Sequence, residues 1–183
     1  MKMPSRYQIP LLMMAGLLLV WMVYQPGLSG PWLVDDDGNL GGFKTLQADT
    51  TSYSNIIFSN TSGPLGRSVS MASFAANHAL GLFSTPALKT TGLILHMING
   101  LLVFMVLRRL FRIKTPALPS TQSTSLAAII AIWWMLLPLN ISSVLYIVQR
   151  MTLLASFFSL ATILVYVIGR EMLEGRRNTG MLL

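Results

Sequence analysis

The chain has 183 residues, of which 53% are hydrophobic and 10% charged, and its net charge is +7. Soluble domains carry about 25% charged residues, so this composition excludes an ordinary soluble domain and predicts an all-α, polytopic membrane protein. The absence of cysteine excludes disulfides and thiol chemistry. The positive residues lie mostly beside apolar segments, so they indicate membrane topology, and we expect no nucleic-acid partner.

The first apolar segment, residues 7–25, follows a short stretch that contains Lys2 and Arg6. Its length suits one membrane span, because about 20 apolar residues cross a bilayer core. A cleavable signal peptide also has a basic start and an apolar centre. No clear small-residue cleavage site precedes the polar stretch that follows, and more apolar segments come later, so we predict an uncleaved anchor.

Residues 26–87 are predicted to form a long loop on the outer side of the membrane. The loop holds three of the six acidic residues side by side, Asp35, Asp36 and Asp37. Adjacent carboxylates repel one another, so the cluster must be solvated, paired with cations or ready to bind a ligand. Three glycines follow within five residues and favour tight turns, so the first half of the segment is predicted to be a loop.

The second half of this loop carries apolar residues at helical spacing, ended by Gly81. This pattern predicts an amphipathic helix that lies along the membrane surface. Its apolar face is predicted to consist of Leu65, Val69, Ala72, Ala76 and Leu80.

Three further spans are predicted, at residues 88–107, 126–139 and 144–168. Pro138 is expected to kink or end the third. Four cations occupy the seven residues 108–114, and by the positive-inside rule this stretch faces the cytoplasm. The basic clusters at the N-terminus and after the fourth span then fall on the same side, so we expect a multi-pass protein of the bacterial inner membrane with both termini cytoplasmic.

This topology brings a mixed set of acidic and basic residues to the outer face. Such a set suits transfer from an anionic lipid-linked donor: a carboxylate accepts a proton or binds a metal, and cations neutralise the phosphate. Arginine donates two parallel hydrogen bonds to phosphate, and an arginine within the membrane marks a functional site. The set consists of Asp35, Asp36, Asp37, Arg67, His78, Lys89, Gln149 and Arg150.

Each feature also has a purely structural interpretation. An acidic run in an outer loop is often a solvated surface, His78 is a candidate surface histidine, and Arg150 is close enough to the end of its span to extend its guanidinium to the interface. His96 and Asn99 lie one turn apart and suit an interhelical hydrogen-bond pair. The two histidines do not have zinc-site spacing, and the sequence contains neither a Walker loop nor a nucleophile elbow.

Three blocks of the sequence, taken in order, resemble the N-terminal part of GT-C-type membrane glycosyltransferases. Similarity is greatest to bacterial relatives of the tetratricopeptide-bearing protein O-mannosyltransferases and of pilin glycosyltransferases, and it covers most of residues 33–169. The blocks are the aspartates at 35–37, the stretch GRSVSMASFAANHALG at 66–81 continuing to LHMING at 95–100, and LPLNISSVLYIVQRMT at 137–152.

The resemblance implies a transferase that moves a sugar from a polyprenyl-phosphate-linked donor to a protein or glycan acceptor, with inversion and retention both open. Asp35 or Asp36 would be the catalytic carboxylate, and Arg67 and Arg150 would contact the donor phosphate. A divalent ion, Mg²⁺ or Mn²⁺, is expected at Asp36 and Asp37.

Such enzymes usually have eight or more spans, so we expect the chain to be their N-terminal module, and a fragment of a larger transferase is one alternative. A non-catalytic assembly or scaffold subunit is the alternative from another functional class. A small transporter is less favoured, because the two halves of the sequence show no repeat.

Overall fold

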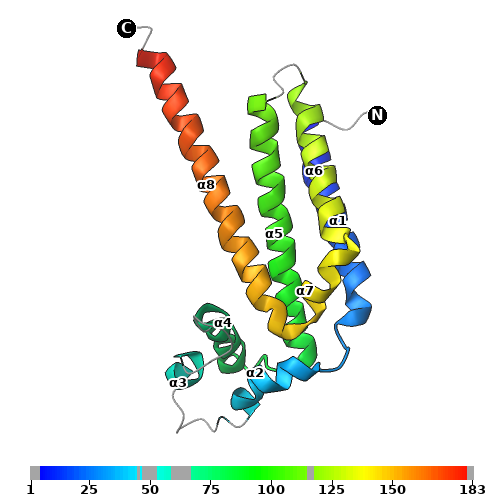
Figure 1. Ribbon diagram of the computed structural model, residues 1–183. Helices are drawn as coiled ribbons and strands as arrows, with labels where there is room; N and C mark the ends of the chain where they lie inside the picture. Colours follow the sequence, from blue (N-terminus) through cyan, green and yellow to red (C-terminus); the bar gives the residue numbers. More distant parts are fainter. Residues whose placement is uncertain (1–4, 45, 47–52, 59–66, 115–117, 181–183) are drawn as a thin grey trace. The chain divides into compact units, whose positions relative to one another are not determined.

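The computed structural model consists of helices joined by turns and short loops, and the part of the chain that it describes contains no strand (Figure 1). The described residues are 5–44, 46, 53–58, 67–114 and 118–180. The elements in chain order are α1 (Ser5–Tyr24), η1 (Gln25–Gly27), α2 (Val34–Lys44), α3 (Tyr53–Phe58), α4 (Ser68–Ala79), α5 (Thr85–Lys114), α6 (Ser120–Leu136), η2 (Pro138–Asn140), α7 (Ile141–Leu145), η3 (Ile147–Gln149) and α8 (Arg150–Gly180). The predicted all-α class is confirmed.

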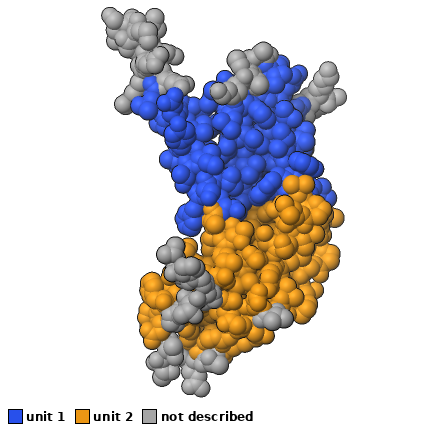
Figure 2. Space-filling view, viewed as in Figure 1, with its two compact units in different colours: residues 1–20, 97–136, 156–183 blue, residues 21–96, 137–155 orange. Residues whose placement is uncertain are grey.

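The chain divides into two compact units, coloured separately in Figure 2. Unit 1 consists of residues 1–20, 97–136 and 156–183, and unit 2 of residues 21–96 and 137–155. Helices α1, α5 and α8 are continuous across these boundaries, so each contributes residues to both units.

Three stretches are long and apolar enough to cross a membrane: Tyr7–Gly27, Thr85–Ile113 and Ile147–Leu173. A fourth candidate is the bent pair Ser120–Leu136 and Pro138–Leu145, whose axes differ by 52°. Large apolar side chains such as Met22 remain exposed on these helices, which is the surface that spanning helices offer to lipid. The architecture is therefore that of three or four candidate spans, close to the four predicted from the sequence.

Two helices begin at other residues than the predicted spans. The third span was expected from residue 126, but α6 already begins at Ser120 and ends before Pro138, as the proline predicts. The fourth was expected to start at residue 144, but Tyr146 has extended backbone angles (φ −95°, ψ 112°), so the long helix α8 begins at Arg150. Arg150 is therefore the first residue of this helix rather than a residue within it.

Small residues allow the helices of unit 1 to pack closely. A Cβ atom built on Gly16 of α1 would lie within 3.0 Å of the Ile132 side chain on α6. Gly100 of α5 meets Met135 of α6 in the same way. Glycine permits such close approach of backbones where the hydrophobic effect no longer drives helix association, as within a membrane.

The acidic stretch is helical, contrary to the loop expected from its glycines. Asp36 is the third residue of α2, and its Oδ2 accepts a hydrogen bond from the N–H of Leu33, which precedes the helix. That contact is half of a capping box. The three aspartates lie in the first turn and Lys44 in the last, where each charge suits the helix dipole. These terminal interactions offset the low helix propensity of the glycines.

The predicted helix after residue 65 is confirmed as α4, which is followed by Gly81 with φ +71°. The predicted apolar face is exposed in the described residues, as a helix that lies on a membrane surface requires: Val69 is 59% exposed and Leu80 73%. Leu65, which was predicted to belong to this face, lies outside the described residues. Other positions pack inward, including Phe74 in the core of unit 2. That core consists of Leu40, Phe43, Met71, Phe74, Ala75, Leu88 and Ile147.

Candidate active site

The three adjacent aspartates have three different environments, beginning with Asp36, which is fully buried. Its Oδ2 accepts from the N–H of Leu33 (3.0 Å), and its Oδ1 accepts from the N–H of Val148 (2.9 Å). Backbone N–H donors stabilise a buried carboxylate that water no longer reaches. Asp36 thereby joins the start of α2 to η3, 112 residues further along the chain.

Asp35, by contrast, has an exposed side chain. The Tyr146 hydroxyl donates a hydrogen bond to its Oδ2 at 2.8 Å. This bond to the carboxylate raises the pKa of Tyr146, so the phenol keeps its proton and remains a donor at neutral pH. Asp35 is therefore a carboxylate that solvent reaches while one of its oxygens is fixed in place.

Asp37 is also exposed, and Lys44 satisfies its charge. The two side chains form an ion pair at 2.5 Å, two turns apart on α2. The Lys44 ammonium also lies 3.9 Å from the centroid of the Trp32 ring, a cation–π contact. This member of the cluster behaves as a surface ion pair.

Lys89 on α5 holds the segment that leads into α2. Its Nζ donates to the carbonyl oxygens of Gly30 (3.0 Å) and Pro31 (3.2 Å), and the side chain is 4% exposed. Its charge also attracts that of Asp36. The buried carboxylate therefore has a buried cation in its surroundings as well as two N–H donors.

Arg150 is the second buried cation of unit 2, at 2% exposure. Its Nη1 donates to Asn77 Oδ1 (2.7 Å) and its Nη2 to the carbonyl of Leu88 (2.9 Å). A weaker contact reaches the carbonyl of Ser73 (3.3 Å), and the guanidinium lies 4.1 Å from the Phe74 ring centroid. The arginine therefore does not extend to the surface, and it links the start of α8 to α4 and α5.

The acceptor for Arg150 is itself held in one orientation. Asn77 Nδ2 donates to Thr91 Oγ1 (3.0 Å), and that hydroxyl donates to the carbonyl of Ala87 (3.0 Å). The amide oxygen of Asn77 thus points to the arginine because its nitrogen is bound on the other side. Arg150 Nε is buried and makes no hydrogen bond to the described residues.

The other predicted site residues, Arg67, His78 and Gln149, have different environments. Arg67 is half-buried and precedes α4, where its carbonyl accepts from the N–H of Met71. His78 packs against aromatic rings, and its Nδ1 lies 3.0 Å from the Tyr53 hydroxyl. Gln149 accepts a hydrogen bond from Thr152 (2.8 Å). No contact joins these three side chains to the acidic cluster in the described residues.

The aspartates do not form a ready-made chelating group. Both oxygens of Asp36 are taken by N–H donors and the side chain is buried, while Asp37 is paired with Lys44. Among the described residues, no group of three histidine, aspartate or glutamate side chains is arranged to hold a metal. The ion expected at Asp36 and Asp37 from the family resemblance stays a prediction.

Sequence reasoning did not assign three groups that the structure brings to the site: Tyr146, Asn77 and the N–H of Val148. Tyr146 and Asn77 lie within the blocks that carry the family resemblance, so an early focus on polar residues in those blocks would have included them. The contribution of Val148 is a backbone group, and nothing in its side chain signals it.

Comparison of the chain with protein-family models, with curated proteins and with solved structures found no match.

Proposed function

We propose that the chain is a membrane glycosyltransferase module that transfers a sugar from a polyprenyl-phosphate-linked donor to a protein or glycan acceptor. The observation that carries this proposal is the contrast between Asp35 and Asp36, an exposed carboxylate next to a buried one. The exposed group is free to meet substrate, and its buried neighbour fixes the helix that carries it. The resemblance of the three sequence blocks to GT-C enzymes supports the same chemistry.

In this mechanism Asp35 is the general base. One carboxylate oxygen accepts the proton of the acceptor hydroxyl, while Tyr146 holds the other oxygen by its hydrogen bond. The acceptor oxygen forms a bond to the anomeric carbon of the sugar as the bond between that carbon and the donor phosphate oxygen breaks, and the phosphate leaves as an anion that cations stabilise. Asp36 is a positioning residue, since its oxygens are occupied by Leu33 and Val148.

Arg67 is proposed to bind the donor phosphate directly. Arg150 is proposed to contribute to phosphate binding indirectly, because it holds the start of α8 against α4 and α5. Arg67 is half-buried, and its side chain makes no hydrogen bond to another described residue, so its guanidinium is available to a ligand. Asp35 would hold any divalent ion, Mg²⁺ or Mn²⁺, that takes part, and the ion would supply positive charge to stabilise the leaving phosphate; loss of transfer on chelation, restored by either ion, tests its participation. His78 and Gln149 are proposed to contact the donor or acceptor sugar.

The proposed location is the bacterial inner membrane, with both termini cytoplasmic and residues 26–87 outside. This arrangement counts the bent pair of α6 and α7 as one span, giving an even number. Reporter tags placed at residue 60 and at the C-terminus test it. An outside report from the first and an inside report from the second are expected, and a cytoplasmic report from residue 60 would place Asp35 on the wrong side for this mechanism.

The decisive experiment compares Asp35→Asn with Asp37→Asn in purified full chain supplied with lipid-linked sugar donors. Both variants remove one exposed carboxylate from the same helical turn, so they are matched in charge and position. Asp35→Asn should lower transfer by at least 100-fold, the size of a general-base contribution, and Asp37→Asn should leave it nearly unchanged. Equal activity of the two variants would refute the catalytic role of Asp35.

A non-catalytic scaffold subunit is the second candidate. It is favoured by the observation that Asp35, Asp36 and Asp37 each already have a partner within the described residues. An exposed apolar face on α4 would then bind the partner protein. The same pair of variants separates the two functions. If the protein is a scaffold, Asp35→Asn and Asp37→Asn should have equal effects on assembly and on stability.

A further inference from the structure

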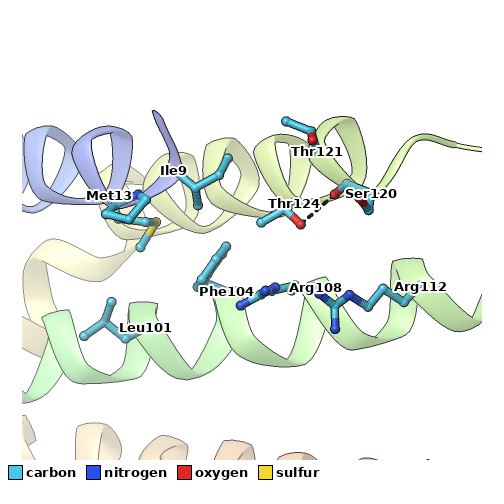
Figure 3. Close-up of a pocket in the computed structure, with 10 residues that line it drawn as sticks. Ile9, Met13, Leu101, Phe104, Arg108, Arg112, Ser120, Thr121 and Thr124 are labelled. Carbon is cyan, nitrogen blue, oxygen red and sulfur yellow. Dashed lines mark hydrogen bonds between the residues drawn. The ribbon is translucent and has the colours of Figure 1, made fainter. Parts of the chain in front are cut away.

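Unit 1 contains a pocket of about 510 Å³, and none of the residues that line it is proposed above to take part in catalysis. Side chains from α1, α5 and α6 line it, and Figure 3 shows how they are arranged. Met13, Leu101 and Phe104 form an apolar wall. Arg108, Arg112 and Ser120 lie at the other end, so the pocket is apolar at one end and cationic at the other (Figure 3).

The two arginines are not neutralised by the protein. Arg108 and Arg112 are one turn apart on α5, so their charges lie on the same helix face. Both side chains are exposed, and in the described part of the chain neither forms an ion pair or a hydrogen bond. Arg109, between them, is instead paired with Glu171 of α8. Two unpaired guanidinium groups at this spacing favour an anionic ligand.

Hydroxyl groups add neutral donors at the same end. Ser120 is the first residue of α6, and Thr121 and Thr124 also line the pocket. The Thr124 hydroxyl donates to the carbonyl of Ser120 (2.7 Å). The start of α6 also places the positive end of its helix dipole there, which adds to the attraction for an anion.

We propose that this pocket binds an anionic phospholipid, with its phosphate between Arg108 and Arg112 and an acyl chain along Met13, Leu101 and Phe104. Free phosphate would use only the cationic end and leave the apolar wall without a ligand. A zwitterionic lipid would bring a cation toward two arginines. The helices α1 and α5 are long and apolar enough to cross a bilayer, so a lipid has direct access from the side.

Native mass spectrometry of the purified full chain provides the test. The protein is released from nanodiscs of equal phosphatidylglycerol and phosphatidylcholine, and the retained lipids are counted. Wild-type protein should keep phosphatidylglycerol preferentially. Arg108→Gln and Arg112→Gln should each reduce its retention about 10-fold, and Arg108→Lys should keep part of it, because lysine preserves the charge without the two parallel hydrogen bonds.

Arg170→Gln is the matched control, because it removes one exposed positive charge from α8 outside the pocket. It should retain phosphatidylglycerol like the wild type, and circular dichroism should give the same helix content for every variant. Equal retention by Arg108→Gln and Arg170→Gln, equal retention of the two lipids by the wild type, or displacement of lipid by millimolar inorganic phosphate would each overturn the proposal. Glycosyl transfer is not part of this readout, so the two proposals fail separately.

Discussion

The two units differ in whether these charged side chains are buried and whether the protein itself provides their partners. In unit 2, Asp36, Lys89 and Arg150 are all at most 4% exposed, and each is surrounded by polar groups of the protein. In unit 1, Arg108 and Arg112 are exposed and without a protein anion among the described residues. A buried charge must be satisfied by the fold itself, whereas an exposed one remains available to a ligand.

We therefore expect buried charged side chains to stabilise the fold and exposed ones to be available for binding or catalysis. The buried groups of unit 2 hold α2, α4, α5 and the start of α8 together, and Asp35 remains exposed to solvent. Removing a buried charge should therefore destabilise the protein, while removing an exposed one should change binding or catalysis. The four predictions below test that division, in order of decreasing effect on stability.

Arg150→Met should have the largest effect. The methionine fills much of the same space but leaves Asn77 Oδ1 buried without a donor, and the carbonyl of Leu88 loses the second hydrogen bond that it accepts. We expect the free energy of unfolding to fall by about 3 kcal/mol, because an unsatisfied buried acceptor costs about 1–3 kcal/mol. Denaturant titration in detergent, followed by circular dichroism, measures it. Arg170→Met, at an exposed position of α8, is the control, and an equal loss there would contradict the prediction.

Asp36→Asn should have an intermediate effect on the free energy of unfolding. The amide oxygen can still accept from one backbone N–H, but the amide nitrogen faces the other N–H and the attraction to Lys89 is lost. We expect a loss of about 2 kcal/mol, within the range for hydrogen bonds to charged groups. The same titration measures it, with Asp37→Asn as its neighbour control. A stability unchanged from wild type would mean that the buried carboxylate does not hold α2 in place.

Glu171→Gln should have a smaller effect, because it removes a half-exposed ion pair with Arg109. Pairs of this kind contribute up to about 1 kcal/mol, so the expected loss is about 0.5 kcal/mol. Thermal melting in low-salt detergent solution should detect it. Adding 0.5 M NaCl to the wild type should reproduce most of the same shift through screening; a salt-independent difference would argue against an ionic origin.

Asp37→Asn should have the smallest effect. Its ion pair with Lys44 is largely exposed, at 63% for the aspartate and 48% for the lysine. Solvent screens such pairs, so the free energy of unfolding should change by less than about 0.5 kcal/mol. The measurement is the same melt as for Glu171→Gln. A larger loss would show that the end of α2 depends on this pair.

The sequence alone predicts the coarse architecture well, because long apolar segments and a proline break leave strong signals. The first residue of α8 is less predictable from the sequence. Apolar residues are already present at Val144, but the backbone is extended at Tyr146, so the helix begins after it. The helical state of α2 was also missed. Its signals were present in Asp36 three residues after Leu33 and in Lys44 at the far end, but the glycines argued for a loop.

The hydrogen bonds that connect distant residues in the candidate site are not predictable from local sequence patterns. The contact of Asp36 with Val148 joins positions 112 residues apart through a backbone group. Periodicity predicted the helix α4 and its apolar side, which is exposed at Val69 and Leu80. It gave no sign that the opposite side buries Asn77, the polar partner of Arg150.

The bond between Asp36 and Val148 also sets an order of events during synthesis. Residue 36 leaves the ribosome long before residue 148, so the carboxylate has no buried donor while most of the chain is being made. It must stay hydrated until the segment before α8 arrives and excludes water. The exposed carboxylate of Asp35 is then fixed by Tyr146, two residues earlier in that same segment, so the last part of unit 2 to be translated completes the candidate site.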